Sequence, residues 1–161
     1  MTIAVGSHLP EATFMVFSDG KPAPVTTKDV FFGKKVVLFA VPGAFTPTCH
    51  LKHLPGFLAN IGAFKVRGID TVACVAVNDH HVMKAWAEAA GTAGKILLLA
   101  DGTAAFAKAM GLDTELGPMG IRSKRYSAFV DNGVLKILHV EDSPGQAEAS
   151  GAEALLRELP A

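Results

Sequence analysis

The stretch KKVVLFAVPGAFTPTCHLKHLPGF, Lys34–Phe57, changes its pattern halfway. Lys34–Val41 is a short and nearly continuous apolar run, which is typical of a central strand covered on both faces. Prolines and glycines follow, and from Pro47 onward leucines recur at helical spacing. A strand end, a turn and a helix start therefore meet just before Cys49, one of only two cysteines in the chain.

Two further apolar runs, Asp70–Val77 and Lys95–Asp101, have the same pattern of a buried strand. The crossover before the first of them, Pro47–Val66, predicts a helix with a kink at Pro55 and Gly56. Its core-facing stripe is expected to consist of Leu51, Leu54, Leu58, Ile61 and Phe64. Strands that alternate with helices in this way are typical of an α/β sheet with helices packed on its faces.

A second helix is predicted after Asp70–Val77. Asn78 or Asp79 can cap its start, and Gly91 can end it. Its buried face is predicted to consist of Val82, Ala85, Trp86 and Ala89. A shorter helix is expected near Thr103–Met110.

The C-terminal third predicts a loop, a hairpin and a closing helix. Residues 111–124 contain glycines and a proline, so contacts rather than propensity must order this loop. Asn132 and Gly133, flanked by apolar runs, indicate a hairpin with a type I′ turn. Ser150 and Glu153 have the spacing of a capping box for the last helix. The apolar face of that helix is expected to consist of Leu155, Leu156 and Leu159.

The elements run strand, helix, strand, helix, strand, short helix, hairpin and helix, after an extended segment over residues 12–27 that can itself form a hairpin. This order predicts an α/β fold of the thioredoxin-like type, with a central mixed β-sheet flanked by helices and an N-terminal β extension. The length suits one well-buried core, and no repeat or low-complexity segment divides the chain. We therefore expect a single domain over residues 1–161.

Composition disfavours several classes of function. Lysine plus arginine and aspartate plus glutamate number 15 each, so the chain lacks the overall basic charge that attracts proteins to nucleic acid. The N-terminus lacks the pattern of a signal peptide, and no apolar run reaches the roughly 18 residues of a membrane span, so we expect no membrane partner. Two cysteines are too few for a disulfide scaffold and suit a reducing compartment, so we expect a cytoplasmic protein.

The position of Cys49 indicates a reactive thiolate. In the first turn of a helix, free backbone N–H groups and the positive end of the helix dipole favour an anion. Thr46 lies close enough along the chain for its hydroxyl to contact the sulfur or its substrate, and Pro42 and Pro47 stiffen the turn. From these residues alone an alternative stays open, in which Pro47 begins an ordinary helix, Thr46 caps it and Cys49 is a small buried apolar residue.

The octapeptide PGAFTPTC resembles the P-x-x-x-T-x-x-C signature of peroxiredoxins, in the form typical of the type II or peroxiredoxin-5 group. The resemblance continues in order through LKHLPGF, VACVAVND, MKAWAEA, LADGTAAFAKAMGL, RSKRYSAFVDNGVLK and the VE of Val140–Glu141, and so covers nearly the whole chain. It implies a thiol peroxidase that reduces hydrogen peroxide and alkyl hydroperoxides.

The resemblance also implies roles for individual residues. Cys49 matches the peroxidatic cysteine, Thr46 the hydroxyl that orients the peroxide, and Pro42 the residue that shields the sulfur. Arg125, in KRYS, matches the arginine that reaches the thiolate and the peroxide oxygens. An arginine keeps its charge and offers several donors to the charge that develops as the O–O bond breaks. Cys49 becomes a sulfenic acid in this reaction, and neither a metal nor an organic cofactor is implied.

The second half of the cycle needs a thiol that reduces the sulfenic acid. Some members of the group carry a resolving cysteine near the C-terminus, but Ala149 stands at about that place here. Cys74 is the only internal candidate, and its place within an apolar strand indicates a core thiol. We therefore expect an external thiol, glutathione with glutaredoxin or thioredoxin, to form a mixed disulfide with Cys49. The family also implies a homodimer, formed through loops and helix ends near the active site.

Three other interpretations concern the same region. Cys49 and His53 are spaced i, i+4 with His50 beside them, but no further metal ligand is evident, so we expect no metal and take His53 as a residue that packs or supports its neighbours. A disulfide oxidoreductase is disfavoured because the sequence CHLK lacks the second cysteine of C-x-x-C. A non-catalytic peroxide sensor or redox-regulated binding domain would use the same cysteine. Arg122 and Lys124 indicate only a solvated basic strand end.

Overall fold

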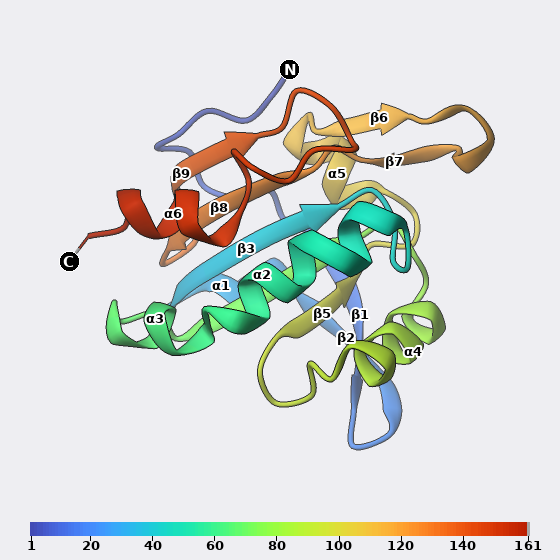
Figure 1. Cartoon of the computed structure of the whole chain (residues 1–161), viewed down its shortest axis with the longest axis horizontal. Coiled ribbons are helices and arrows are strands. Elements are labelled where there is room, and N and C mark those ends of the chain that lie inside the picture. Colours follow the sequence, from blue (N-terminus) through green and yellow to red (C-terminus); the bar gives the residue numbers. More distant parts are fainter. Residues whose placement is uncertain (161) are drawn as a thin grey trace.

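A mixed sheet of seven strands forms the centre of the molecule, which the computed structural model describes for residues 1–160 (Figure 1). In chain order the strands are β1 (Thr13–Ser18), β2 (Lys21–Thr26), β3 (Lys35–Val41), β4 (Thr71–Ala76), β5 (Leu97–Ala100), β8 (Tyr126–Asp131) and β9 (Val134–Val140). Across the sheet they lie in the order β2-β1-β5-β4-β3-β8-β9. β3, β4 and β5 are parallel, and the other pairs are antiparallel. The predicted α/β class, the mixed sheet and its three central strands are confirmed.

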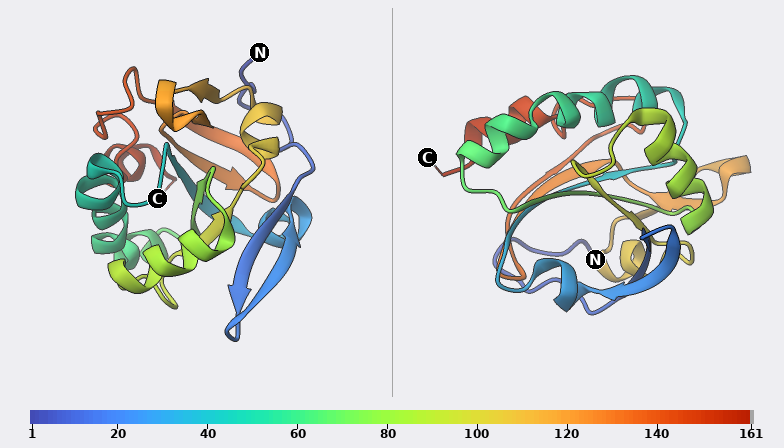
Figure 2. Two further views of the ribbon diagram at one scale, coloured as in Figure 1. Left: turned by 90° about the vertical axis from the view of Figure 1, so that its right-hand side faces the viewer. Right: turned by 90° about the horizontal axis from the view of Figure 1, so that it is seen from below.

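Helices cover both faces of this sheet, which Figure 2 shows in the view from below. They are α1 (Thr27–Phe31), the π-helical segment η1 (Cys49–His53), α2 (Leu54–Ala59), α3 (Ile61–Val66), α4 (His80–Ala90), α5 (Ala105–Met110), the 3-10 turn η2 (Gly117–Met119) and α6 (Ala152–Glu158). The core under α2, α3, α4 and α6 contains Phe57, Trp86 and Leu155. The core on the opposite face contains Phe31 of α1 and Phe106 of α5. None of the described helices is long and apolar enough to cross a membrane.

Both predicted hairpins are present. β1 and β2 pair over their full length and extend the sheet beyond β5, which confirms the N-terminal β extension. β8 and β9 are joined at Asn132 and Gly133, whose φ angles are 49° and 80°. Positive φ at both central residues is the requirement of a type I′ turn, so the predicted turn type is confirmed.

The helix predicted over Pro47–Val66 begins in a wide turn. In η1 the Leu54 N–H donates to the Cys49 carbonyl, five residues earlier instead of four. Pro55 follows directly and has no N–H for a regular helical hydrogen bond, which accounts for the local π geometry. Pro55 therefore disturbs the helix, as predicted. The disturbance is an extra residue in the preceding turn rather than a simple kink.

The phase of this helix also differs from the prediction. Leu51 was expected in the core and is 70% exposed, whereas His53 is buried. The extra residue in the π turn rotates the residues before it relative to α2, so a regular helical spacing places Leu51 wrongly. A second break, at Asn60 between α2 and α3, is not indicated by any proline or glycine at that position.

The predicted start and end of α4 are confirmed, but most of its predicted buried face is wrong. The Asp79 side chain accepts a hydrogen bond from a backbone N–H of the first turn, and a left-handed glycine ends the helix. The buried side chains are Met83 and Trp86. The residues predicted as buried but found half-buried or exposed are Val82, Ala85 and Ala89. Alanines lie on both faces, and the face with the larger Met83 and Trp86 removes more apolar area from water.

The capping box predicted for the last helix is wrong. Gly151 is the N-cap of α6 and no side chain caps it. The Ser150 hydroxyl donates instead to the Glu141 carboxylate, so it is not available to cap the helix. Of the predicted apolar face, Leu155 and Leu159 are buried, while Leu156 is half-buried and packs against the same core.

The segment 111–124 is more regular than the predicted loop. It contains β6 (Asp113–Glu115) and β7 (Ile121–Ser123), which pair as a small antiparallel hairpin around η2. Three-residue strands are too short to produce a detectable alternation of polar and apolar residues. This hairpin projects from the sheet on the side of the N-terminal end of η1 (Figure 1).

Candidate active site

The turn after β3 places Cys49 at the start of a helix, as predicted. The His50 N–H donates to the Thr46 carbonyl (2.8 Å), so the first helical hydrogen bond spans the cysteine. The Ala44 N–H donates to the Asn78 side-chain oxygen (2.9 Å), which ties the turn to the loop after β4. Phe45 has a φ of 64°, a conformation that is uncommon for a bulky residue and is concentrated at functional sites.

The glycine in this turn is closely approached by neighbouring side chains. A Cβ atom at Gly43 would lie 3.2 Å from the Thr46 methyl group and 3.4 Å from Nη1 of Arg122. Arg122 is itself fixed, because its guanidinium donates to the carbonyls of Val77 and Met119 (2.9 Å each). The prediction of Arg122 as a merely solvated cation is therefore wrong, while Lys124 is exposed as expected.

The Cys49 sulfur lies between two donors that the sequence analysis had named. The Thr46 hydroxyl is 2.8 Å from Sγ, and Nη2 of Arg125 is 2.9 Å from it. Thr46 Oγ1 also lies 2.7 Å from the Gly43 carbonyl, but a hydroxyl has only one hydrogen to donate. The hydroxyl can therefore donate to the Gly43 carbonyl when Cys49 is a thiol, and to the sulfur when Cys49 is a thiolate.

Arg125 reaches the sulfur from the segment between β7 and β8, and it is 2% exposed. Its Nε and Nη2 donate to the Pro144 carbonyl (3.1 and 3.0 Å), and its Nη1 donates to Nδ1 of His53 (2.9 Å). With the bond to Cys49, these contacts use four of the five N–H donors of the guanidinium. The remaining Nη1 hydrogen has no partner among residues 1–160.

The charge of Arg125 has no carboxylate to balance it in the described part of the chain. The two ion pairs there, Lys84–Glu88 and His139–Glu158, do not involve it. A buried charge is costly unless an opposite charge or several hydrogen bonds compensate it. The hydrogen bond to the Cys49 sulfur and the three to Pro144 and His53 therefore provide the compensation for this buried charge.

His53 fixes the orientation of Arg125. Its Nε2 lies 2.9 Å from the Ser150 carbonyl, which can only accept, and its Nδ1 faces Arg125, which can only donate. The ring is therefore the neutral tautomer with hydrogen on Nε2. Burial, and next the positive charge of Arg125, lower the pKa of His53 to about 3, although the Ser150 carbonyl acts in the opposite direction. The neutral His53 thus accepts a hydrogen bond from Arg125 and adds no second positive charge beside it.

The segment 141–151 contains the backbone carbonyls that contact Arg125 and His53. Besides the carbonyls of Pro144 and Ser150, it supplies the Gly145 carbonyl, which accepts from the Thr48 hydroxyl (3.1 Å). The segment is held in turn by Glu141, whose carboxylate accepts from the backbone and side chain of Ser150. This contribution could not be predicted from the sequence, because backbone carbonyl groups have no signature in side-chain chemistry. The i, i+4 spacing of Cys49 and His53 was the one available signal.

The other predicted residues take simpler positions. Pro42 is buried directly after β3, and its shielding of the sulfur stays a prediction. Cys74 is buried in β4 opposite Phe39 of β3, as predicted for a core thiol. Burial, and next the nearby Cys49, raise the pKa of the Cys74 thiol, against a smaller effect of Arg125. Both cysteines are free.

The histidines near Cys49 have partners other than a metal. His50 accepts a hydrogen bond from the Trp86 indole (3.0 Å), and both ring nitrogens of His53 are used. Within residues 1–160, no three or more His, Cys, Asp and Glu side chains lie together in a group that could hold a metal ion.

Comparisons with known proteins show what the chain is similar to. The Redoxin family model matches residues 4–156. The chain is 47% identical over 165 residues to "Peroxiredoxin-2E-2, chloroplastic" of Oryza sativa subsp. japonica, and the match covers 98% of this chain and 73% of that protein. Reduced Prx3 from Vibrio vulnificus in complex with hydrogen peroxide has a TM-score of 0.93 and 48% identity, with 99% and 100% of the two chains covered. Peroxiredoxin 5 from Alvinella pompejana has a TM-score of 0.84 and 32% identity, with 98% and 97% covered.

Proposed function

The chain belongs to the peroxiredoxins, in the type II or peroxiredoxin-5 group, and is a thiol-dependent peroxidase; on this premise we propose that Cys49 is the residue that attacks the peroxide. The observation that carries the assignment is the placement of the Cys49 sulfur between the Thr46 hydroxyl at 2.8 Å and the Arg125 guanidinium at 2.9 Å. Both groups donate hydrogen bonds, so both stabilise a thiolate.

The proposed reaction is a displacement on oxygen. The Cys49 thiolate attacks the terminal oxygen of the hydroperoxide, an S–O bond forms and the O–O bond breaks, leaving a sulfenic acid and an alkoxide or hydroxide. The leaving oxygen takes up a proton and departs as an alcohol or water. The substrate class follows from the family, and the neighbour from Vibrio vulnificus holds hydrogen peroxide.

Thr46 and Arg125 have separate roles in this proposal. The unpartnered N–H of Arg125 is available to the peroxide, where it stabilises the negative charge that develops on the leaving oxygen. The Thr46 hydroxyl is freed when Cys49 loses its charge, and it can then hydrogen-bond to the oxygen that the sulfur has gained. His53 acts only through Arg125, as a positioning residue.

We propose that an external thiol completes the cycle, either glutathione with glutaredoxin or thioredoxin. Ala149 leaves no cysteine near the expected C-terminal position, and Cys74 is fully buried within a strand with a raised pKa. A thiol of high pKa is a weak nucleophile, because only the thiolate attacks sulfur. Since Cys49 is also fully buried, the incoming thiol needs a local opening of η1 or of segment 141–151.

We also propose a homodimer and a cytoplasmic location. Phe45 on the active-site turn is exposed, and so are Met119 and Ile121 on the β6–β7 hairpin. Met119 lies against Gly43, so these apolar side chains border the same turn, and apolar surface of this kind suits a symmetric contact. Sedimentation equilibrium of wild type and of Phe45→Glu tests the dimer. The proposed cytoplasmic location rests on the two unpaired thiols alone. The word "chloroplastic" in the name of the rice relative describes that protein.

Steady-state peroxide consumption tests the proposed function. Wild type, Cys49→Ser and Cys74→Ala are assayed with glutathione and glutaredoxin and, in parallel, with the thioredoxin system. We expect many turnovers with at least one system in wild type and Cys74→Ala, and none in Cys49→Ser. Consumption of only one equivalent of peroxide per chain with every thiol donor would instead favour a sensor. Activity that survives in Cys49→Ser would refute the assignment of the nucleophile.

A further inference from the structure

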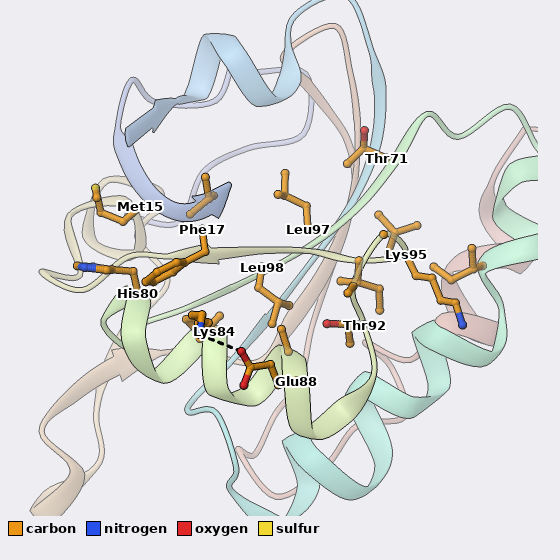
Figure 3. A pocket seen from close by; sticks show the side chains of 18 of the residues that line it. Met15, Phe17, Thr71, His80, Lys84, Glu88, Thr92, Lys95, Leu97 and Leu98 are labelled. Atoms are coloured by element: carbon orange, nitrogen blue, oxygen red, sulfur yellow. Dashed lines mark ion pairs between the residues drawn. The ribbon is translucent and has the colours of Figure 1, made fainter. Parts of the chain in front are cut away.

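A cavity lies away from the thiol site, between α4, α3 and the sheet (Figure 3). Its volume is about 570 Å³, within the range of roughly 300–1,000 Å³ that is common for small-molecule sites. Neither Cys49 nor Arg125 lines it. No step of the peroxidase reaction uses this cavity, so its role is a separate question.

The inner wall of the cavity is apolar. Val72 of β4, Leu98 of β5 and Met83 of α4 line it and are buried in the core beneath. Ile61 of α3 and Ala87 of α4 line it as well and are only half-buried. Figure 3 shows Leu98 pointing from the strand towards α4, whereas Leu97 points to the other side of the strand. A hydrocarbon chain placed there would leave water without giving up any hydrogen bond.

The charged residues around this wall are unbalanced. Lys84 is paired with Glu88 at 2.9 Å, the dashed contact in Figure 3. Asp70 is engaged by the backbone N–H of Lys35 (2.8 Å). Lys65 and Lys95 also line the cavity, and neither has a carboxylate partner in the described part of the chain. Three lysines and two carboxylates therefore line the cavity, an excess of one positive charge that favours a monoanion.

One polar group in the wall lacks a partner. Thr92 is fully buried, and its hydroxyl makes no hydrogen bond within residues 1–160. Its backbone is fixed, because its carbonyl accepts from the N–H groups of Lys95 and Ile96 (2.9 and 3.0 Å). Figure 3 shows Thr92 and Lys95 at the same end of the cavity, opposite His80 and Phe17. A buried hydroxyl without a partner destabilises the protein, and an acceptor brought to that end would relieve the cost.

We propose that this cavity binds an amphipathic monoanion, a hydrocarbon chain that ends in a carboxylate. The chain lies along Met83 and Leu98, and the carboxylate lies at the end with Thr92 and Lys95. Lys95 provides a positive charge there, Lys65 adds another to the lining of the cavity, and Thr92 provides a hydrogen-bond donor. The site is distinct from Cys49, so it would bind such a ligand whether or not the thiol is oxidised.

Titration with decanoate, followed by calorimetry, tests this proposal on the full chain. We expect saturable binding of one decanoate per chain, and affinity reduced about fivefold in the Lys65→Gln/Lys95→Gln variant, since exposed charge pairs contribute modestly. The matched control is Lys108→Gln/Lys136→Gln, which removes two exposed lysines on α5 and β9 and should bind as wild type does. Peroxidase activity, which depends on other residues, checks that each variant is folded.

The position and chemistry of the ligand are tested separately. In ¹H–¹⁵N spectra, decanoate should shift the amide signals of Thr92, Lys95 and Ile96 and leave those of Cys49 and His50 in place. The uncharged 1-decanol should bind more weakly than decanoate to wild type, and equally well to wild type and the lysine variant. Absence of saturable binding, equal affinities in the two double variants, or shifts confined to other segments would each overturn the proposal.

Discussion

Cys49 and Cys74 are equally buried, at 0% exposure each, yet the groups around their sulfurs differ. Cys49 stands at the start of η1 with two hydrogen-bond donors at its sulfur. Cys74 stands in the middle of β4, where burial in apolar surroundings raises the pKa of its thiol. Burial alone therefore does not decide reactivity. What separates the two sulfurs is the presence of donors that compensate the loss of water.

The largest expected effect comes from removing the Cys49 sulfur, and removal of the Cys74 sulfur is its control. Cys49→Ser should lower peroxide turnover by roughly a thousandfold or more, because the nucleophile is lost. Cys74→Ala should keep turnover within about threefold of wild type, since only packing changes. Stopped-flow measurement of peroxide consumption, with circular dichroism to check folding, provides the comparison. A large loss in Cys74→Ala with normal oxidation of Cys49 would mean that Cys74 resolves the sulfenic acid after all.

Arg125→Lys should have the next largest effect. A lysine keeps the positive charge but cannot contact Cys49, His53 and Pro144 together, so we expect kcat/KM to fall by about a hundredfold. The neighbouring exposed cation provides the control, because Lys124→Gln should change kcat/KM by less than about twofold. Equal losses of activity in both variants would mean that Cys49 depends on nearby positive charge of any kind, and not on the geometry of the Arg125 guanidinium.

Thr46→Val removes one of the two donors at the Cys49 sulfur while it keeps the shape of the side chain. A hydrogen bond to a charged group contributes about 1.5–3 kcal/mol, so kcat/KM should fall by roughly ten- to a hundredfold. Thr46→Ser retains the hydroxyl and should recover most of the loss. Second-order rates of peroxide reduction under single-turnover conditions measure both variants. A valine variant with the wild-type rate would leave Arg125 as the only donor that matters.

His53 variants separate its two hydrogen bonds. Asn places an acceptor near the position of Nδ1, and Gln places a donor near that of Nε2. If His53 acts by orienting Arg125, His53→Gln should lower kcat/KM by about tenfold and His53→Asn should lower it less, since only Asn retains the acceptor. Equal losses in both variants, together with equal losses of stability, would indicate a purely structural role.

The smallest expected effect is on the pH dependence of stability. The pKa of His53 in the folded protein is about 3, below the usual value of 6.5, so the unfolded chain binds a proton more readily. Stability contributed by neutral His53 is therefore lost as pH falls from about 6.5 towards 3, by about 0.7 kcal/mol between pH 7 and pH 6. Urea unfolding of wild type and His53→Gln at both pH values should show this difference in slope. Parallel pH dependences of the two proteins would contradict the buried neutral ring.

Prediction from the sequence was most successful where a pattern has one physical cause. Short continuous apolar runs rich in β-branched residues are typical of strands covered on both faces, and the Asn132–Gly133 pair suits few turns other than type I′. Prediction was least successful where two local patterns compete. The face of α4, the phase of η1 and the cap of α6 each depend on which of several permitted contacts buries more surface or satisfies a distant group.

The candidate site divides along the same line. Cys49, Thr46 and Pro42 could be named because they share one short motif, and Arg125 because the resemblance extends along the chain. The contribution of segment 141–151 could not be named, since its backbone carbonyls reach Arg125 and His53 only after β8, β9 and η1 have packed. Even the approach of Arg125 to the sulfur, across 76 residues, is a consequence of that packing.

The sequence by itself determined the class of fold and the family, and it singled out Cys49 as the candidate nucleophile, because apolar periodicity, turn chemistry and a short motif are local properties of the chain. Only the tertiary structure decided which donors surround the Cys49 sulfur and that a neutral His53 ring accepts a hydrogen bond from Arg125. It also decided that a separate cavity is lined by the unpaired Lys65 and Lys95 and by an unpartnered Thr92. The physical reason is that hydrogen bonds and charge compensation act between groups in space. Their partners are chosen when the strands and helices pack, not when the chain is read in order.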